Sequence, residues 1–411
     1  MQNISSRQWI IYRKYLNSMM RKADIFICGD IINQTTDKQF IDQSIVDVIQ
    51  QCDYSICNFE GTCQSQSRLK GQMLQRSSTL QSLQEAGFDM LLLANNHVTD
   101  YGYDGLKETI RQIEDYDFVH IGAGFKYEDT YRPRVLEISG LKIGLINLCE
   151  AQLGQYKEKE QRYGYAWLGD YYVDERIRYL RREVDYLVVI PHAGLENYPV
   201  PLKQFQQLYR HWCELGVDVV VGGHPHIAQG IEQYGKSIIF YSLGNFFFTG
   251  FNGNMDTWTK GISCVLHFSD NGVNYNVIQH KMNDERVILV QNDINDIEKK
   301  SMVLADENLY KSMLKEQNAM AFKALPLRLY MSALNGTSSD DNIITKCKKI
   351  IYYLFNRNTL YAGSENYRMS VLKRLTENET YRYLTISAIE DQLRESHHRL
   401  LSLIHISEPT R

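Results

Sequence analysis

The sequence predicts an α/β domain followed by a helical region. Between residues 23 and about 280, short apolar runs of strand length alternate with amphipathic helices, which is the pattern of an α/β domain. Polar side chains able to bind a metal come directly after several of these runs, as active-site loops do at the carboxyl ends of strands. After residue 284 the alternation stops and helical patterns dominate.

Individual strands and helices can be placed from the spacing of the apolar residues. The runs that predict strands cover residues 24–28, 54–58, 90–94, 142–148, 186–191, 217–221, 237–241, 262–268 and 273–279. The clearest helix covers residues 201–215, where apolar residues recur at steps of three and four: Leu202, Phe205, Leu208, Trp212 and Leu215. A second helix should follow Tyr103, with Leu106, Ile110 and Ile113 facing inward.

The chain divides into an N-terminal extension, an α/β domain, a mostly helical C-terminal region and a short tail. Their predicted bounds are residues 1–22, 23–284, 285–400 and 401–411. In the C-terminal region, residues 285–298 have a mixed pattern, residues 308–324 read as a helix, and polar residues 335–342 read as a loop. The tail, LSLIHISEPTR, resembles a translated sequencing-library adapter, and we leave it out of the functional argument.

The composition argues against several classes of protein. A formal net charge of −4 with no basic stripe argues against nucleic-acid binding. The eight cysteines form no CxxC pair and several lie in apolar runs, which is typical of buried free thiols in a reducing compartment. No apolar stretch has signal-peptide length at the N-terminus or the ~20 residues of a membrane helix. We therefore expect a cytoplasmic chain with no transmembrane segment, peripheral to the membrane only through a partner.

Several short segments place metal-competent side chains after apolar runs. These side chains are Asp30, Asn58, Glu60, Asn95, Asn96, His97, Asp100, His192, Glu196, His224 and His226. Each segment alone has an ordinary structural interpretation, since an aspartate after a strand is usually a turn residue. In the segment GGHPH, however, His224 and His226 flank a proline, so an extended loop could direct both rings to one centre. The coincidence of all these segments favours a shared metal site, because imidazoles and carboxylates are common metal ligands.

The ordered segments GD, NFEG, ANNHVTDYGYDGL, HAGLE, GGHPH and YSLGNFFF resemble the CapA family, a branch of the calcineurin-like metallophosphoesterases. The resemblance spans roughly residues 24–281, and the order, spacing and flanking strands agree together. It implies a four-layer α-β-β-α sandwich, in which two sheets pack face to face with helices outside, and a C-terminal helical appendage. It also implies two divalent metal ions at one end of the sheets.

The resemblance assigns the metal ligands residue by residue. The implied ligands are Asp30, Glu60, Asn96, His192, His224 and His226. Glu60 would bridge both metals, Asp30 and His226 would complete the first site, and the other three residues would complete the second. His97 is the implied general acid or transition-state stabiliser, with Asp100 as its orienting partner. Such a mixed set of oxygen and nitrogen ligands suits manganese, iron or zinc better than magnesium.

The sequence departs from the wider superfamily at two positions, and both departures are shared with the CapA branch. The usual D-x-H pair is absent, since Asp30 is followed by Ile31 and Ile32. Glu60 stands where the superfamily has aspartate. The first metal site therefore has three expected protein ligands. Two further residues are candidates for the pocket wall, Asn245 in YSLGNFFF and Glu150 in EAQLG.

The favoured function is a metal-dependent hydrolase of a phosphoester or a γ-glutamyl amide. Its implied partner is a cell-surface polymer or its phosphorylated or γ-glutamyl precursor, in capsule, poly-γ-glutamate or surface-polysaccharide synthesis. The alternative is a non-catalytic metal-binding subunit of a polymer synthase or export complex. A purely structural α/β protein would require every polar cluster to be incidental.

Overall fold

The computed structural model describes most of the chain. The described residues are 21–34, 39–64, 73–152, 154–158, 160–249, 256–283, 285–290, 294–324, 326–327, 329–330 and 362–406. The expected N-terminal extension up to residue 20, the expected loop at residues 335–342 and the end of the tail, residues 407–411, lie outside them.

The first sheet has the strand order β19-β18-β17-β1-β2-β5-β6, with β16 also paired to β1. Its strands are β1 Lys22–Ile32, β2 Tyr54–Phe59, β5 Met90–Leu92, β6 Val119–Ile121, β16 Asn245–Phe248, β17 Lys260–Ser269, β18 Gly272–Met282 and β19 Val287–Leu289. β1 is parallel to β2 and β16 and antiparallel to β17. The carboxyl ends of β1, β2 and β5 therefore lie at the same edge of the sheet.

The second sheet has the order β14-β15-β13-β12-β9-β8. Its strands are β8 Arg134–Ile138, β9 Leu141–Cys149, β12 Tyr186–His192, β13 Val219–Val221, β14 Ile231–Tyr234 and β15 Ser237–Phe240. The neighbours β9, β12, β13 and β15 are parallel. Two small sheets join β10 Gln155–Tyr156, β11 Gly164–Ala166 and β7 Ala123–Gly124, and β3 Thr62–Gln64 with β4 Leu74–Arg76.

The two large sheets pack face to face. Their central strands are apolar at consecutive positions, so one set of side chains faces the other sheet and the next set faces the outer helices. The core between the sheets includes Ile27 and Ile56 from the first sheet and Val188 and Val219 from the second. Each fully buried aliphatic side chain of this kind contributes roughly 1.5–3 kcal/mol through the hydrophobic effect.

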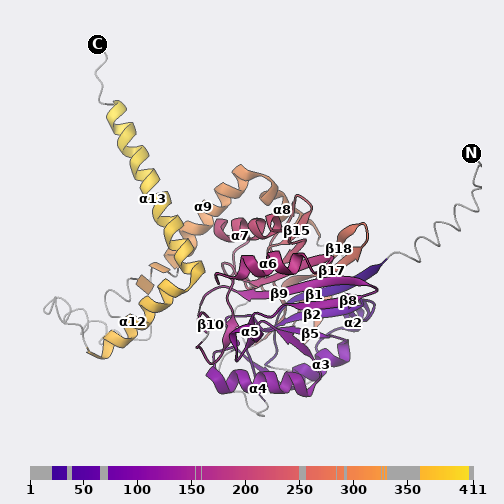
Figure 1. Cartoon of the computed structure of the whole chain (residues 1–411). Coiled ribbons are helices and arrows are strands. Elements are labelled where there is room, and N and C mark those ends of the chain that lie inside the picture. The colour runs from indigo at the N-terminus through magenta and orange to yellow at the C-terminus, as the bar shows by residue number, and fades with distance from the viewer. Residues whose placement is uncertain are drawn as a thin grey trace, which may run out of the picture.

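Helices cover the outer face of each sheet (Figure 1). The helices of the domain are α2 Gln43–Gln50, α3 Ser78–Ala86, α4 Gly102–Asp115, α5 Tyr127–Thr130, α6 Val173–Arg181 and α7 Lys203–Glu214. Leu83 of α3 and Ile113 of α4 pack on the first sheet, whereas Ile177 of α6 and Trp212 of α7 pack on the second. The result is the four-layer α-β-β-α sandwich that the resemblance implied.

In the C-terminal part that the structure describes, the helices with defined bounds are α8 Ile294–Ala305, α9 Glu307–Ala324, α12 Ala362–Glu377 and α13 Glu379–Ile406. In Figure 1, α13 starts at the body of the molecule and runs outward. Its Leu384 and Leu314 of α9 belong to the same buried cluster as the outer face of the second sheet. Among the described residues, none of the helices combines the length and apolar content that a membrane crossing requires.

The strands and helices predicted from periodicity are present, but the stretch at residues 285–298 is more ordered than predicted. β19 extends the first sheet, and α8 begins at Ile294 where a mixed pattern was expected. The apolar run of residues 287–290 is too short to identify a strand by its pattern alone, and the contacts that order this stretch are those of β19 with β18 and of α8 with β14. Residues 401–406 of the tail continue α13.

Candidate metal centre

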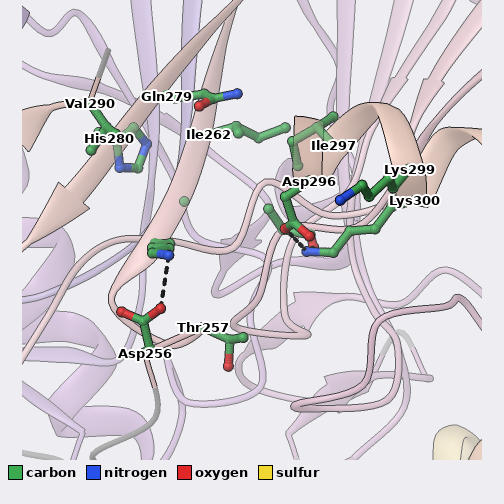
Figure 2. Close-up of a pocket in the computed structure, with 13 residues that line it drawn as sticks. Asp256, Thr257, Ile262, Gln279, His280, Val290, Asp296, Ile297, Lys299 and Lys300 are labelled. Carbon is green, nitrogen blue, oxygen red and sulfur yellow. Dashed lines mark hydrogen bonds and ion pairs between the residues drawn. The ribbon is translucent and has the colours of Figure 1, made fainter. Parts of the chain in front are cut away.

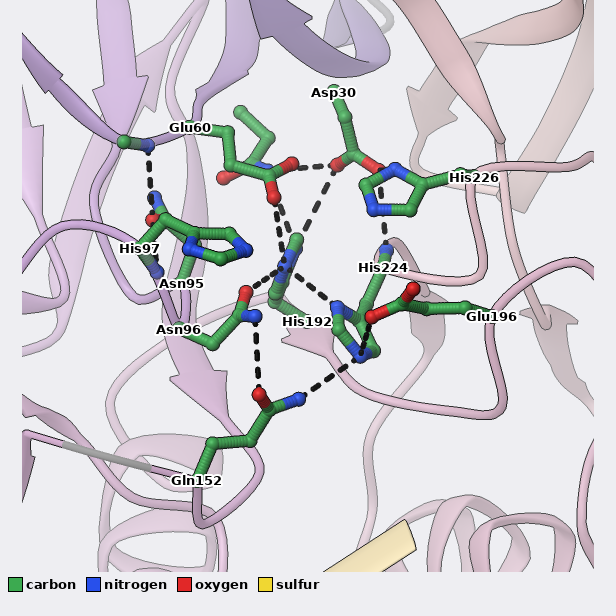
Figure 3. A network of polar contacts seen from close by, with 12 residues as sticks. Asp30, Glu60, Asn95, Asn96, His97, Gln152, His192, Glu196, His224 and His226 are labelled. Carbon is green, nitrogen blue, oxygen red and sulfur yellow. Dashed lines mark hydrogen bonds and ion pairs between the residues drawn. The ribbon is translucent and has the colours of Figure 1, made fainter. Parts of the chain in front are cut away.

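The carboxyl ends of parallel strands from both sheets meet at one end of the sandwich. There Asp30 of β1, Glu60 after β2 and Asn96 after β5 approach His192 of β12 and the loop after β13. Figure 3 shows these side chains directed toward one centre, together with His224 and His226. All six are 5% exposed or less. The structure thus brings together every residue that the sequence analysis proposed as a metal ligand.

Asp30 lies inside β1, at a register irregularity, whereas the prediction placed it just after a strand. Asn58 Nδ2 donates to Asp30 Oδ1 at 2.7 Å, and the backbone N–H of His224 donates to Oδ2 at 3.3 Å. His192 Nδ1 lies 3.6 Å from Asp30 Oδ1. These contacts fix the carboxylate in place and leave it facing the centre.

One group of donor atoms converges on His192 Nε2. Asn96 Oδ1 lies 3.0 Å from this nitrogen, and His224 Nδ1 lies 3.1 Å from it. Glu60 Oε1 is 3.9 Å away. Two ring nitrogens, an amide oxygen and a carboxylate oxygen at such spacing are a suitable ligand set for one divalent transition metal.

A second group forms around His226 and Asp30. His226 Nδ1 lies 3.3 Å from Asp30 Oδ2 and 3.0 Å from Asn245 Oδ1. The His226 ring packs against Trp258, with 4.6 Å between the ring centroids, so its orientation is restricted. Asn245 therefore contacts a proposed ligand, as the sequence analysis anticipated.

The GGHPH loop has an unusual backbone. His224 and His226 both have a positive φ, 92° and 58°, and residues other than glycine rarely adopt this backbone region. Such conformations persist only where surrounding contacts enforce them, and they cluster at functional sites. Here the strained backbone directs two rings on either side of Pro225 into the centre.

Glu60 is the feature that best fits a cation. Its side chain is fully buried, and neither carboxylate oxygen has a hydrogen-bond partner within the part of the chain that the structure describes. Burial and the nearby Asp30 carboxylate raise the pKa of Glu60 to about 8. A buried carboxylate with no donor is costly unless a charge compensates it. A divalent ion between Asp30, Glu60 and the histidines would supply that charge.

The histidines differ in charge preference. Burial, reinforced by the neighbouring imidazoles, lowers the pKa of His192 and His224 well below its ordinary value. They are therefore neutral, as metal ligands must be. Burial also favours the neutral form of His226, but the Glu60 and Asp30 carboxylates outweigh it and raise the pKa to about 10. A metal ion bound by these carboxylates would replace that proton.

His97 and Asp100 form a pair beside the cluster. His97 Nδ1 lies 2.7 Å from Asp100 Oδ2, and 23% of the His97 side chain is exposed. Burial opposes the charged form, yet the Asp100 contact and the Glu60 charge raise the pKa of His97. The ring points toward the centre in Figure 3. The loop is held by Asn95, whose Oδ1 accepts from the backbone N–H of His97 at 3.3 Å.

Three polar side chains surround the outer nitrogen of His224, and the sequence analysis named two of them, Glu150 and Glu196. Gln152 Nε2 lies 3.1 Å from His224 Nε2, and Gln152 Oε1 accepts from Asn96 Nδ2 at 3.2 Å. Glu150 Oε1 is 3.6 Å from His224 Nε2, and Glu196 Oε1 is 3.9 Å away. Gln152 was missed, although the position of EAQLG directly after β9 was an available signal.

A separate cavity of about 380 Å³ lies between β17, β18 and α8 (Figure 2). Two of its lining lysines pair with acidic groups, Lys260 with Asp256 at 2.8 Å and Lys300 with Asp296 at 2.6 Å. His280 lies in its wall, 1% exposed, and burial lowers its pKa to about 3. Among the described residues that line it, this cavity lacks the convergent ligands of the metal centre.

Relatives are found both by sequence and by structure. The chain is 32% identical over 204 residues to the capsule biosynthesis protein CapA of Bacillus anthracis, which is 48% of each chain. It is 27% identical over 256 residues to the PGA biosynthesis protein CapA of Bacillus subtilis strain 168, which is 59% of this chain and 66% of that protein. The chain thus spans about half to two thirds of the length of these relatives.

Among solved structures, the chain is similar to a 5'-nucleotidase precursor from Thermus thermophilus, with 13% identity and a TM-score of 0.42. That match covers 69% of this chain and 59% of the other. The model of the family described as bacterial capsule synthesis protein PGA_cap matches residues 15–250, more than half of the chain. The chain belongs to this family of bacterial capsule synthesis proteins.

Proposed function

We propose that this chain is a metal-dependent hydrolase that cleaves a phosphoester, or a γ-glutamyl amide, in capsule, poly-γ-glutamate or cell-surface polysaccharide biosynthesis. The observation that carries the proposal is Glu60, a fully buried carboxylate to which no described residue donates a hydrogen bond, surrounded by atoms suited to metals. Family membership and the names of the CapA relatives support the pathway.

In this proposal each side chain has a defined task. Glu60 faces both donor groups and would be shared by two divalent ions, manganese, iron or zinc. Asp30 and His226 would hold one ion. The second would be held by Asn96, His192 and His224. When bound, such a metal pair acidifies a water molecule and neutralises charge on a phosphoryl or acyl oxygen.

His97 would donate a proton to the leaving group. Asp100 engages its Nδ1, which leaves Nε2 as the nitrogen that can carry a proton toward the substrate. The Asp100 contact and the Glu60 charge favour the protonated ring, since they raise the pKa of His97 against the effect of burial. Partial exposure of His97 allows contact with a substrate, whereas the metal ligands are closed off behind it.

The test is a metal-reconstitution assay. Purified protein would be stripped with a chelator, reloaded with Mn²⁺, and assayed on mono- and bis-phosphoesters and on a γ-glutamyl amide. We expect turnover only after reloading, and a loss of at least about a hundredfold in His224→Ala. The control is His211→Ala, because His211 pairs with Asp174 on the outside of the domain.

The outcomes separate the two functions. Turnover that survives chelation, or that His224→Ala leaves undiminished, would overturn the hydrolase proposal. Stoichiometric metal binding without turnover of any substrate would instead support the alternative, a non-catalytic metal-binding subunit of a polymer synthase or export complex. Ile32 favours this alternative, because it is buried, has no metal-binding atoms and stands where the wider superfamily usually has a histidine ligand.

A further inference from the structure

The first residues of α13, and Asn378 directly before it, are polar yet buried, and α13 begins against the loop that follows β9. Asn378, Glu379 and Thr380 are each 3% exposed. They lie beyond residues 15–250, the part of the chain that the family model matches. Thr380 bonds Glu150 in the loop after β9, and 230 residues separate the two in the sequence. Burial of polar groups is tolerated only when they are hydrogen-bonded, so their partners indicate what these residues do.

Glu379 holds the backbone of that loop from two sides. Its Oε2 accepts from the backbone N–H of Ala151 at 2.7 Å and from Trp167 Nε1 at 3.2 Å. Its own backbone N–H donates to the carbonyl oxygen of Ala151 at 3.0 Å. The reciprocal bonds fix the position of the residue between Glu150 and Gln152.

Thr380 holds the side chain of Glu150. The Thr380 hydroxyl donates to Glu150 Oε2 at 2.6 Å, and the backbone N–H of Gly194 lies 3.3 Å from the same oxygen. The other oxygen, Oε1, accepts from Gln152 Nε2 at 2.9 Å and lies 3.6 Å from His224 Nε2. Glu150 is itself 0% exposed, so these donors take the place of water around its carboxylate.

The contacts form a continuous path from α13 to a proposed metal ligand. Glu150 and Gln152 lie at the outer nitrogen of His224, Nε2, whereas its inner nitrogen, Nδ1, faces His192 at 3.1 Å. Gln152 Nε2, an amide donor that also bonds Glu150 Oε1, faces this outer nitrogen, so the two side chains fix the orientation of the ring with its inner nitrogen toward His192. We propose that the first turn of α13 is part of the metal centre, with Thr380 and Glu379 as positioning residues that set Glu150 and Gln152 against His224.

This inference rests on the proposed metal centre, and its test measures metal binding and not turnover. The variant is Thr380→Val in the full chain, which keeps the shape of the side chain but removes the hydroxyl donor. The matched control is Thr385→Val on the same helix, because Thr385 Oγ1 has no hydrogen-bond partner among the residues described. Metal affinity is measured by calorimetric titration of the stripped proteins with Mn²⁺.

We expect Thr380→Val to weaken Mn²⁺ affinity about tenfold, the lower range for residues that orient a ligand from behind. Thr380→Ser, which retains the hydroxyl, should restore the affinity to within about threefold, and Thr385→Val should match the wild type. In a Glu150→Gln background, Thr380→Val should add little further loss, because the acceptor whose position it sets has changed.

The contrary results are equally specific. Wild-type affinity in Thr380→Val, or full additivity with Glu150→Gln, would overturn the positioning role while leaving the proposed function intact. A wild-type protein that binds no Mn²⁺ would overturn both. If Thr380→Val does not fold, Glu379→Gln replaces it, since it weakens the acceptor of the Ala151 N–H and should lower affinity in the same direction.

Discussion

At the scale of single residues, the centre is defined by groups that would be unfavourable in any other setting. Glu60 is a buried carboxylate without donors among the described residues, and His224 and His226 have backbone conformations that few histidines adopt. Each such feature costs stability of order 1–3 kcal/mol and persists only where other contacts over-determine it. Their concentration in one place is what separates a built site from scattered polar side chains.

The first prediction concerns Glu60→Gln. Replacing a buried carboxylate by an amide removes a poorly compensated charge, so the metal-free variant should be about 1–2 kcal/mol more stable than the metal-free wild type. Added Mn²⁺ should stabilise the wild type and leave the variant nearly unchanged. Urea unfolding with and without Mn²⁺ measures both effects. A variant that Mn²⁺ stabilises as much as the wild type would contradict the bridging role.

The second prediction concerns the pH dependence due to His280. Its pKa in the folded protein, about 3, lies below the ordinary value of 6.5, so the unfolded chain binds the proton more readily. The stability from neutral His280 is therefore lost as the pH falls from 6.5 toward 3. Between about pH 7.5 and about pH 5, the free energy of unfolding of His280→Leu should fall by about 2 kcal/mol less than that of the wild type. Equal losses in urea unfolding at the two pH values would refute this.

At the scale of secondary structure, β1 can approach the chain that leads into β16 because Gly29, next to Asp30, has no side chain. A Cβ at Gly29 would lie 1.8 Å from the carbonyl oxygen of Gly244, and the Asp30 N–H donates to that same oxygen. This close approach lets β16 run beside β1 and brings Asn245 next to Asp30.

The third prediction follows for Gly29→Ala. The added methyl group must displace backbone, so we expect destabilisation of about 2–4 kcal/mol, with weakened metal binding. Gly235→Ala is the control, because nothing lies within 4 Å of its Cβ and only its positive φ opposes the substitution. That control should cost about 1 kcal/mol. Thermal unfolding of both variants compares them, and equal losses would contradict the crowding argument.

Periodicity predicted most strands of both sheets and α7, and the strand-end motifs carried the family resemblance that implied the six proposed ligands. Those signals are local, since each lies within a few residues of an apolar run. Gln152 and Thr380 were not predicted, because their importance depends on a contact between segments 230 residues apart. No local pattern reports such a contact, and α8 was missed for the same reason.

At the scale of the whole molecule, α9 and α13 share the core of the domain. Leu384 of α13 is 0% exposed and belongs to the cluster that covers the second sheet. Phe205 of α7 packs edge-on against Tyr383, with 5.5 Å between the ring centroids. A helix held in this way should unfold together with the domain.

The fourth prediction tests that cooperativity with Leu384→Ala. Truncation of this buried side chain should cost about 2–4 kcal/mol and move the midpoint of a single unfolding transition. Leu393→Ala on the same helix is the control, since Leu393 is 65% exposed and should cost little. Urea denaturation followed by tryptophan fluorescence reports the domain. An unshifted midpoint for Leu384→Ala would mean that α13 unfolds independently.

The proposed ligands come from both sheets, and this origin has a mechanical consequence. Asp30, Glu60 and Asn96 belong to or follow strands of the first sheet, whereas His192, His224 and His226 belong to or follow strands of the second. An ion bound by both sets would act as a cross-link between two layers whose shared core is apolar. Metal supply would then set the rigidity of the sandwich as well as its chemistry, with about 2.7 kcal/mol of added stability at roughly a hundredfold excess of ion over Kd.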